Sequence, residues 1–328
     1  MTAERTYSAI RDESVERLLA RELPCVAEAV SALRLPGLAG LVLGGGYGRG
    51  EGGAWEGRPS NDLDFFVLSD LPESRLGEIV TALEPVSRDF TARLGVDVDF
   101  TVRAASRVRL DGGRLMIQEL LRGHVVLAPQ GFDLSAWCGV PERPAGDVPV
   151  SEAARLLMNR GMGLVLAAAR LRQADLSEHD VQFVARNINK AVLGAGDVRL
   201  LAERRYAWSV RERADRLDRP AYRAAVAWKF EPRPVSAAEL PSRWETARTE
   251  LLGAAEALEA ARSDALAQRS VYQLLRWFRR RRTCGDVRSW GVDCTVRVAR
   301  KVVSWLKGPQ AVTTDAPQDL VRDWSVFN

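Results

Sequence analysis

The stretch from Gly44 to Leu68, GGGYGRGEGGAWEGRPSNDLDFFVL, places eight glycines just ahead of a segment that alternates carboxylate and apolar side chains. On a strand, Asp62 and Asp64 would project from the same face, because successive side chains alternate between the two faces. Glycines have no Cβ atom, so their backbone N–H groups can approach an anion closely. This combination favours a sheet whose edge binds an anion, a metal ion or both.

Apolar periodicity predicts the elements around this stretch. Short apolar or alternating runs indicate strands, and spacings of three and four indicate helices. Pro24 predicts a break in the first of these helices. The predicted strands are 37–45, 62–69 and 96–104, the predicted helices are 8–34 and 72–95, and 114–128 is predicted to be a helix followed by a short strand. This order of strands and helices predicts a compact α+β domain over residues 1–130.

The second half of the chain differs in character from the first. Residues 131–149 are rich in proline and glycine, which predicts a linker. From Ser151 onward the periodicity is almost entirely helical, so we expect an all-α bundle over residues 150–310. Residues 311–328 are predicted to be a loosely held tail.

Composition limits the chemistry that is available. Residues 1–150 hold 16 arginines and no lysine against 22 carboxylates, a net −6, and residues 151–328 carry a net +10. This split predicts an acidic half that attracts metal ions beside a half that suits anionic ligands. The chain has only two histidines, and its four cysteines form no CxxC pair, so we expect carboxylate chemistry rather than a zinc or disulfide framework.

The N-terminal residues are charged throughout, and no apolar run approaches the ~18–20 residues that a membrane span needs. We therefore expect a cytoplasmic protein without a membrane span.

A second pair of carboxylates, Asp97 and Asp99, occurs on the strand predicted at 96–104, where the intervening valines face the core. Three or four carboxylates that converge repel one another unless cations lie between them. Magnesium suits this role, because it binds one or two carboxylates together with substrate phosphates. Two such ions would form the arrangement used for in-line phosphoryl or nucleotidyl transfer.

These motifs, LVLGGGYGRGEGG, then DLDFF, then VDVDFTVR, resemble the nucleotidyltransferase superfamily that includes DNA polymerase beta, poly(A) polymerases and aminoglycoside nucleotidyltransferases. The resemblance covers about residues 38–128 and rests on three elements that occur in order. In that family a strand ends in Gly-Gly or Gly-Ser, an acidic-x-acidic strand follows, and a third carboxylate lies on a later strand. The commoner serine is replaced here by Gly46. The helical half also resembles, more vaguely, the substrate domain of small bacterial members.

The resemblance implies roles for individual residues. Asp62 and Asp64 correspond to the catalytic magnesium ligands, and the third ligand corresponds to Asp99 or Asp97, of which Asp99 fits the pattern better. The residues expected to bind the NTP are Gly45, Gly46, Tyr47, Arg49 and Lys190.

Basic residues of the helical half allow two interpretations. Arg186, Lys190 and Asp197 share one helical face, and they either grip a triphosphate or form a solvated, salt-bridged face. Tyr222 and Lys229 are seven residues apart, and Trp228 either stacks on a base or packs in the core. Residues 269–307 carry eleven basic residues against two aspartates. This segment suits nucleic acid or an anionic membrane surface, or else an amphipathic helix pair packed on the bundle.

The sequence therefore predicts a magnesium-dependent nucleotidyltransferase that moves a nucleoside monophosphate, AMP in our prediction, from an NTP to a hydroxyl or phosphate acceptor. A small-molecule acceptor is favoured by the short, two-domain chain. The alternatives are a toxin-like enzyme that modifies RNA or protein, a cyclic-oligonucleotide synthase, and a catalytically idle nucleotide-binding module.

Overall fold

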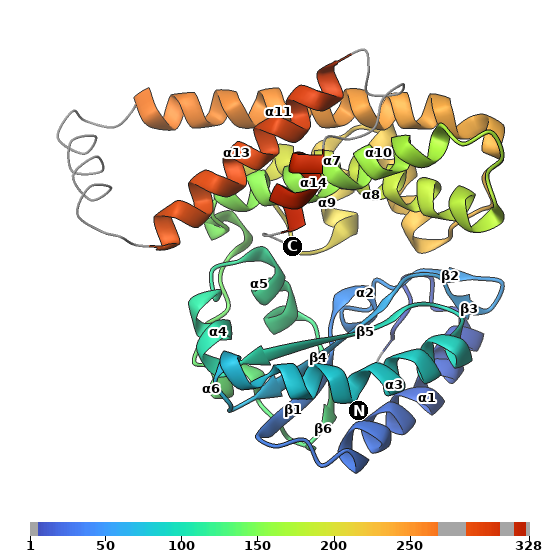
Figure 1. Ribbon diagram of the computed structural model, residues 1–328, viewed down its shortest axis with the longest axis vertical. Helices are drawn as coiled ribbons and strands as arrows, with labels where there is room; N and C mark the ends of the chain where they lie inside the picture. Colours follow the sequence, from blue (N-terminus) through green and yellow to red (C-terminus); the bar gives the residue numbers. More distant parts are fainter. Residues whose placement is uncertain (1–5, 268–286, 309–317, 326–328) are drawn as a thin grey trace. The chain divides into compact units, whose positions relative to one another are not determined.

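A computed structural model describes residues 6–267, 287–308 and 318–325 of the 328-residue chain. The chain divides into two compact units (Figure 1). The first comprises Met1–Pro144 together with Ala227–Arg233, and the second comprises Ala145–Val226 and Pro234–Asn328. The sequence predicted a division in this part of the chain, but the return of 227–233 to the first unit was not foreseen.

The first unit is built on a four-stranded mixed sheet with the order β5-β4-β1-β6. β1 is antiparallel to both β4 and β6, and β4 is parallel to β5. A two-stranded ribbon of β2 and β3 lies between the glycine turn and β4 in the chain. The elements are α1 (Glu13–Ala32), β1 (Leu38–Leu43), α2 (Gly45–Gly48), β2 (Ala54–Trp55), β3 (Arg58–Pro59), β4 (Leu63–Ser69), α3 (Gly77–Leu94), β5 (Val98–Ala104), α4 (Ala105–Leu110), α5 (Leu115–Arg122), β6 (Val125–Ala128) and α6 (Leu134–Cys138).

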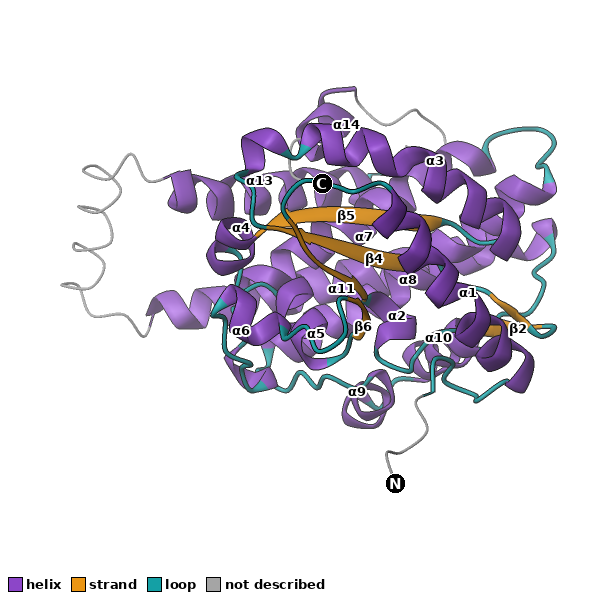
Figure 2. Ribbon diagram, turned by 90° about the horizontal axis from the view of Figure 1, so that it is seen from below, coloured by secondary structure: helices purple, strands orange, loops and turns teal. Residues whose placement is uncertain are grey.

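The two faces of this sheet carry separate cores, which follow from the alternation of side chains along β4. Phe65 and Val67 point into a core shared with α1 and α3, whereas Phe66 and Leu68 point into a core shared with α4, α5 and α6. Figure 2 shows the strands between these helices. The predicted α+β class and the predicted strands are confirmed, with ends that differ by a few residues.

The predicted break at Pro24 is wrong, because α1 runs without interruption from Glu13 to Ala32. A proline inside a helix removes one hydrogen bond and costs about 3 kcal/mol. The apolar stripe continues on both sides of Pro24, and burial of that stripe offsets the cost. Its buried residues are Val15, Leu19, Leu23, Val26 and Val30. The helix begins later than predicted because Asp12 caps it, accepting hydrogen bonds from Ser14 N and Val15 N at 3.0 Å.

The predicted linker at 131–149 is partly folded. Its first part contains α6, whose Leu134 and Cys138 are buried in the core that α4 and α5 share. Asp133 caps this helix by accepting a hydrogen bond from Ala136 N at 3.0 Å. The apolar residues between the turn signals therefore extend the first unit to Pro144.

The second unit is helical, as predicted. α7 and α8 pack against each other, α11 packs on both, and α13 packs on α7. The space between these helices is filled by small and aliphatic side chains, and Trp244 of α11 donates a hydrogen bond to Leu164 O at 2.9 Å. Its helices are α7 (Ser151–Leu171), α8 (Glu178–Ala202), α9 (Val210–Leu217), α10 (Pro220–Phe230, whose last residues belong to the first unit), α11 (Leu240–Ala267), α13 (Val287–Lys307) and α14 (Gln318–Ser325).

The predicted loose tail is also corrected in part, because α14 is a helix held to the bundle. Leu320 is buried, Trp324 Nε1 donates to Asn159 Oδ1 at 3.2 Å, and Asp323 pairs with Lys301 at 2.6 Å. Sequence reasoning missed this amphipathic turn because it is only 8 residues long and lies among polar residues. None of the helices in the described ranges combines the length and the apolar character that crossing a bilayer requires.

Candidate active site

The acidic residues that the sequence singled out lie at one end of the sheet. Asp64 of β4 and Asp99 of β5 are direct partners in the parallel pairing of these strands. Paired residues of neighbouring strands project from the same face, so these two carboxylates extend side by side. Val98 is buried on the opposite face, as the alternating pattern predicted. Asp99 is exposed and Asp64 is half-buried, so both groups are accessible to an ion or a ligand.

The glycine turn lies directly against Asp64. β1 ends at Leu43, and Gly44 N donates a hydrogen bond to Asp64 O at 2.8 Å. Gly45 has a φ of +58°, and a Cβ atom at this position would lie 2.0 Å from Asp64 Oδ2. Only glycine satisfies both conditions, the left-handed backbone and the close approach of the carboxylate. The glycine turn and Asp64 therefore lie together at the same end of the sheet.

Asp62 and Asp97 occupy the residues just before β4 and β5. Leu63 N donates to Asp97 O at 2.9 Å, which extends the contact between the two chain segments to this point. Asp62 is half-buried and Asp97 is exposed. Asp99, rather than Asp97, is the residue that pairs with Asp64 in register. This pairing favours Asp99 as the third carboxylate of the predicted site.

Tyr47 does not have the position that the nucleotide-binding prediction requires. Its side chain is completely buried in the core that the sheet shares with α1 and α3, so it presents no surface to a nucleotide. Burial raises the pKa of its phenol to about 12. Tyr47 follows Gly45 and Gly46 in the short helix α2, and this helix directs the Tyr47 side chain into the core. The sequence pattern alone did not reveal the direction of this side chain.

Arg49 contacts carboxylates. Its guanidinium pairs with Glu51 at 3.5 Å and with Glu119 of α5 at 3.2 Å. These contacts hold the segment after the turn against α5. The predicted role of Arg49 in binding phosphate stays a prediction, which requires the guanidinium to exchange a carboxylate for a phosphate. The ring of His124 contacts the backbone of α5, with Nδ1 2.8 Å from Leu120 O.

Lys229 lies beside the glycine turn, although the sequence pattern did not place it among the expected NTP-binding residues. Its ammonium donates to Glu51 O at 2.9 Å, and it lies 3.4 Å from the place that a Cβ of Gly46 would take. It also lies over the ring of Phe230, 5.6 Å from the centroid. The rarity of lysine could have drawn attention to Lys229, since lysine occurs only four times in a chain with 43 arginines. However, Lys229 lies in a helical segment more than 150 residues from the glycine turn, and no local pattern connects the two.

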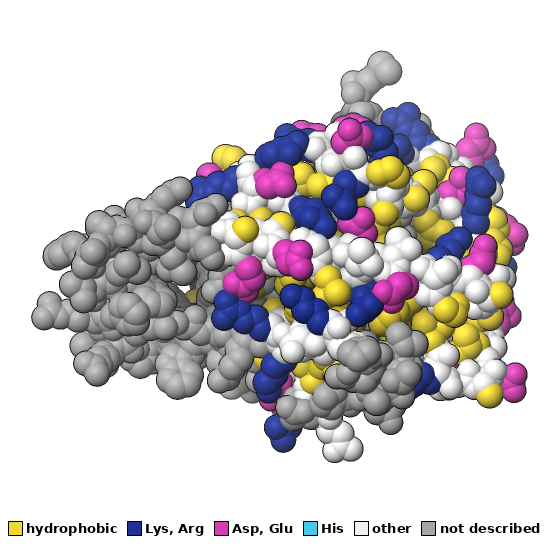
Figure 3. All heavy atoms as spheres, turned by 90° about the horizontal axis from the view of Figure 1, so that it is seen from above, with side chains coloured by type: hydrophobic (Ala, Val, Ile, Leu, Met, Phe, Trp, Pro, Cys, Tyr) yellow, Lys and Arg dark blue, Asp and Glu magenta, His cyan; other side chains and the backbone are white. Residues whose placement is uncertain are grey.

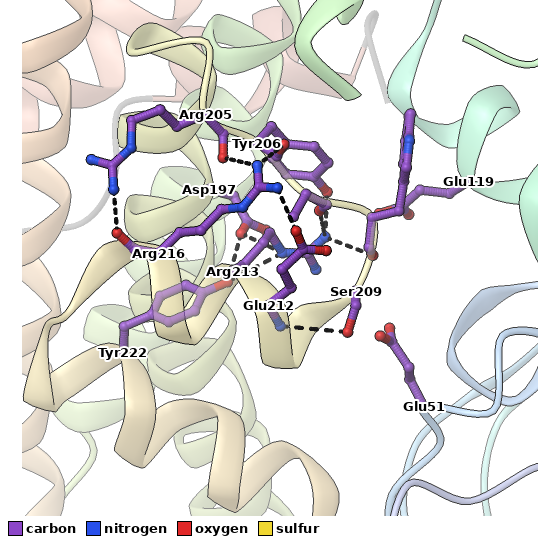
Figure 4. A network of polar contacts seen from close by, with 12 residues as sticks. Glu51, Glu119, Asp197, Arg205, Tyr206, Ser209, Glu212, Arg213, Arg216 and Tyr222 are labelled. Atoms are coloured by element: carbon purple, nitrogen blue, oxygen red, sulfur yellow. Dashed lines mark hydrogen bonds and ion pairs between the residues drawn. The ribbon is translucent and has the colours of Figure 1, made fainter. Parts of the chain in front are cut away.

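Asp197, on the α8 face that the sequence singled out, takes part in a network of polar contacts in the second unit (Figure 4). Asp197 pairs with Arg213 at 3.0 Å and accepts a hydrogen bond from the Tyr222 hydroxyl at 2.7 Å. Arg213 also donates to the Tyr206 hydroxyl at 2.7 Å. Burial, followed by the charge of Asp197, raises the pKa of Tyr222. Asp197 and Tyr222 are thus part of a polar network with Arg213, which agrees with the salt-bridged interpretation of this face.

Lys190 is exposed on α8 and Arg186 is half-buried, so their predicted contact with nucleotide stays a prediction. Trp228 is half-buried, and its Nε1 donates to Arg233 O at 3.1 Å.

The basic segment 269–307 lies largely outside the described residues. In its described part, Val302 and Leu306 of α13 are buried, and Arg300 pairs with Glu259 at 2.8 Å. On the face drawn in Figure 3, acidic and basic side chains of the described residues are interspersed. These features agree with the packed-helix interpretation for the described part of α13. Cys138 is buried and Cys25 is half-buried, and the side chains of Cys284 and Cys294 lie outside the described residues.

Within the described ranges, no three side chains of the Asp, Glu, His or Cys type lie close enough together to enclose a metal ion by themselves. The chain matches no protein-family model, and no curated protein shows significant similarity to it. The chemistry of the site therefore has to be argued from its geometry.

Proposed function

We propose that the protein is a magnesium-dependent nucleotidyltransferase that transfers a nucleoside monophosphate from an NTP to an acceptor and releases pyrophosphate. The observation that carries this proposal is the register of Asp64 with Asp99 beside the left-handed turn at Gly45. Two accessible carboxylates and a glycine turn at one end of a sheet suit a phosphate ester and its counter-ion.

The fit of magnesium can be judged from the donor set. Protein sites for this ion commonly supply only one or two carboxylates, and substrate phosphates and waters complete the octahedron. Asp64 and Asp99 meet that requirement, and Asp62 lies two residues before Asp64. When bound, magnesium would neutralise phosphate charge and lower the pKa of the attacking hydroxyl.

The residues of the chain then have separate roles. The hydroxyl oxygen of the acceptor attacks the α-phosphorus, a new P–O bond forms, and the bond to the oxygen that bridges to the β-phosphate breaks. Asp99 accepts the hydroxyl proton, because it is the exposed member of the pair. Asp64 is held against Gly45 and orients the nucleotide together with its counter-ion. Pyrophosphate leaves with the bridging oxygen and its electron pair.

We propose that Lys229 supplies a positive charge beside the turn. Its ammonium has three donors, and one of them reaches Glu51 O. In the bound complex the ammonium would exchange one of its present contacts for a phosphate oxygen, as a charge-assisted contact to the negative charge that develops on the leaving pyrophosphate. Lys229 has this role in addition to the one predicted for Lys190.

A small-molecule acceptor is the version that the observations favour. In the described part of α13, Arg300 and Lys301 pair with Glu259 and Asp323, so these two side chains offer less charge to the phosphates of a nucleic acid. ATP is the donor that we propose first. An RNA or protein acceptor, and an idle nucleotide-binding module, are outcomes of the same experiment.

The test is incubation of the full chain with each α-³²P-labelled NTP, magnesium and three acceptor classes, namely aminoglycoside-like small molecules, RNA and protein. Label should move to a small product in the wild type, and Asp64→Asn should abolish the transfer while the circular dichroism spectrum is unchanged. Asp70→Asn is the matched control, because Asp70 follows the opposite end of β4 and contacts Trp137 Nε1. Nucleotide binding without any transfer would favour the idle module, and full activity of Asp64→Asn would refute the mechanism.

A further inference from the structure

The Tyr47 hydroxyl is the most heavily used polar group near the site. It donates to Gly53 O at 2.6 Å and accepts from Ser60 N at 2.9 Å and from Asn61 N at 3.3 Å. The ring itself is completely buried. A phenylalanine would fill the same apolar space, so packing alone does not account for a tyrosine at this position.

The three partners of the hydroxyl lie on either side of the β2–β3 ribbon, Gly53 just before it and Ser60 and Asn61 just after it. Ser60 and Asn61 are the two residues that precede this carboxylate, and both of their N–H groups point to the same oxygen. The Asn61 side chain closes the loop from the other side, because its Oδ1 accepts from Gly53 N at 2.6 Å. The side chains of Tyr47 and Asn61 therefore fix the backbone that leads into Asp62.

Gly53 also lies against the backbone of Lys229. A Cβ at Gly53 would lie 2.4 Å from Lys229 O and 2.4 Å from Ser60 Oγ. The backbone of the loop therefore touches the backbone of the residue whose ammonium reaches the glycine turn. A shift of the loop would displace Asp62 and Lys229 together.

We propose that Tyr47 and Asn61 are positioning residues that set the strength of magnesium-nucleotide binding by fixing the loop ahead of Asp62. This inference rests on the proposed function. Residues that support metal ligands in this way typically contribute 10- to 100-fold to metal affinity or activity. The side chains themselves touch neither the nucleotide nor the metal, and they act through the backbone of Ser60, Asn61 and Gly53.

The test is the magnesium dependence of nucleotide binding to the full chain, measured by equilibrium dialysis with whichever labelled NTP the wild type retains. Tyr47→Phe and Asn61→Ala should each raise the magnesium concentration at half-saturation about 10- to 100-fold. Asn61→Ala keeps the buried ring, so it provides the same test if Tyr47→Phe does not fold. Tyr206→Phe is the matched control, because it removes a buried hydroxyl that accepts from Arg213 in the other unit.

The outcomes separate the two proposals. An unchanged magnesium midpoint in both variants, with normal binding by the wild type, would overturn the positioning role and leave the proposed function standing. An equal shift in Tyr206→Phe would also overturn it, since the effect would then be one of general stability. If the wild type binds no NTP at any magnesium concentration, the proposed function fails, and the positioning role fails with it.

Discussion

Lys229 and Glu51 are 178 residues apart in the chain, yet the ammonium of the first donates to the backbone carbonyl of the second at 2.9 Å. This contact holds the lysine beside the glycine turn. In the proposed complex the ammonium exchanges one of its contacts for a phosphate oxygen of the nucleotide.

Replacement of Lys229 by methionine removes this charge and keeps most of the side-chain volume. A hydrogen bond to a charged group contributes about 1.5–3 kcal/mol, so NTP should bind roughly 10- to 100-fold more weakly. Lys301→Met is the control, because Lys301 pairs with Asp323 in the second unit. Both dissociation constants can be measured by isothermal titration, and equal affinities for Lys229→Met and the wild type would show that Lys229 has no part in binding.

Gly45→Ala tests the contact between the turn and the first carboxylate. The new Cβ would lie 2.0 Å from Asp64 Oδ2 on a backbone with φ of +58°, so the turn must move, Asp64 must move, or both. The left-handed backbone alone costs about 1–2 kcal/mol with a side chain present, and we expect nucleotidyl transfer to be lost. Urea unfolding and the labelled-NTP assay report the two effects.

Gly77→Ala provides the comparison, since nothing lies within 4 Å of its Cβ position at the start of α3. It should stabilise the protein by about 0.4–1 kcal/mol and leave transfer unchanged. If Gly77→Ala lost as much transfer as Gly45→Ala, the loss could not be attributed to the contact between Gly45 and Asp64.

The Tyr47 phenol makes the stability of the fold depend on pH in the alkaline range. Burial raises its pKa to about 12 from the ordinary value of 10.0, so the phenol stays protonated in the folded chain where the unfolded chain ionises. Its contribution is complete below pH 10 and is lost as the pH rises to about 12, a total of about 2–3 kcal/mol. The free energy of unfolding of Tyr47→Phe should therefore fall less between pH 9 and pH 11 than that of the wild type. Parallel curves would contradict this.

For the network around Arg213 we expect substitutions to change the free energy of unfolding, whatever the activity of the protein. Arg213 is 4% exposed and pairs with Asp197, so Asp197→Ala would leave a buried guanidinium without its counter-charge, at a cost of about 3–5 kcal/mol. Tyr222→Phe keeps the ion pair and should cost about 1–2 kcal/mol through the lost hydrogen bond to Asp197. Chemical denaturation measures both values, and a smaller loss in Asp197→Ala than in Tyr222→Phe would contradict the assignment.

The sequence sufficed for those parts of the molecule that local rules determine. Alternation along 62–69 and 96–104 placed Asp64 and Asp99 on strands, and the glycines at 44–46 marked the end of β1. Tyr47 was misinterpreted because its direction depends on the helical turn of α2, which follows from the φ of Gly45 and not from any periodicity.

Long-range contacts account for the remaining differences. The place of Lys229 depends on the return of 227–233 to the first unit, and the ion pair of Asp197 joins it to Arg213, a partner 16 residues further along the chain. No local pattern contains that information. Pro24 and α6 show the related effect that tertiary packing outweighs the local signals of proline and glycine.

In the proposed enzyme, Asp64 and Asp99 together hold the metal ion of a bound nucleotide. Crystals of the full chain with Mn²⁺ and an NTP analogue that has a methylene group between the α- and β-phosphorus atoms would locate this ion by anomalous scattering. We expect an anomalous peak bonded to carboxylate oxygens of Asp64 and Asp99 and to phosphate oxygens beside Gly45. A nucleotide whose phosphates lie away from this turn, or an ion that touches neither carboxylate, would contradict it.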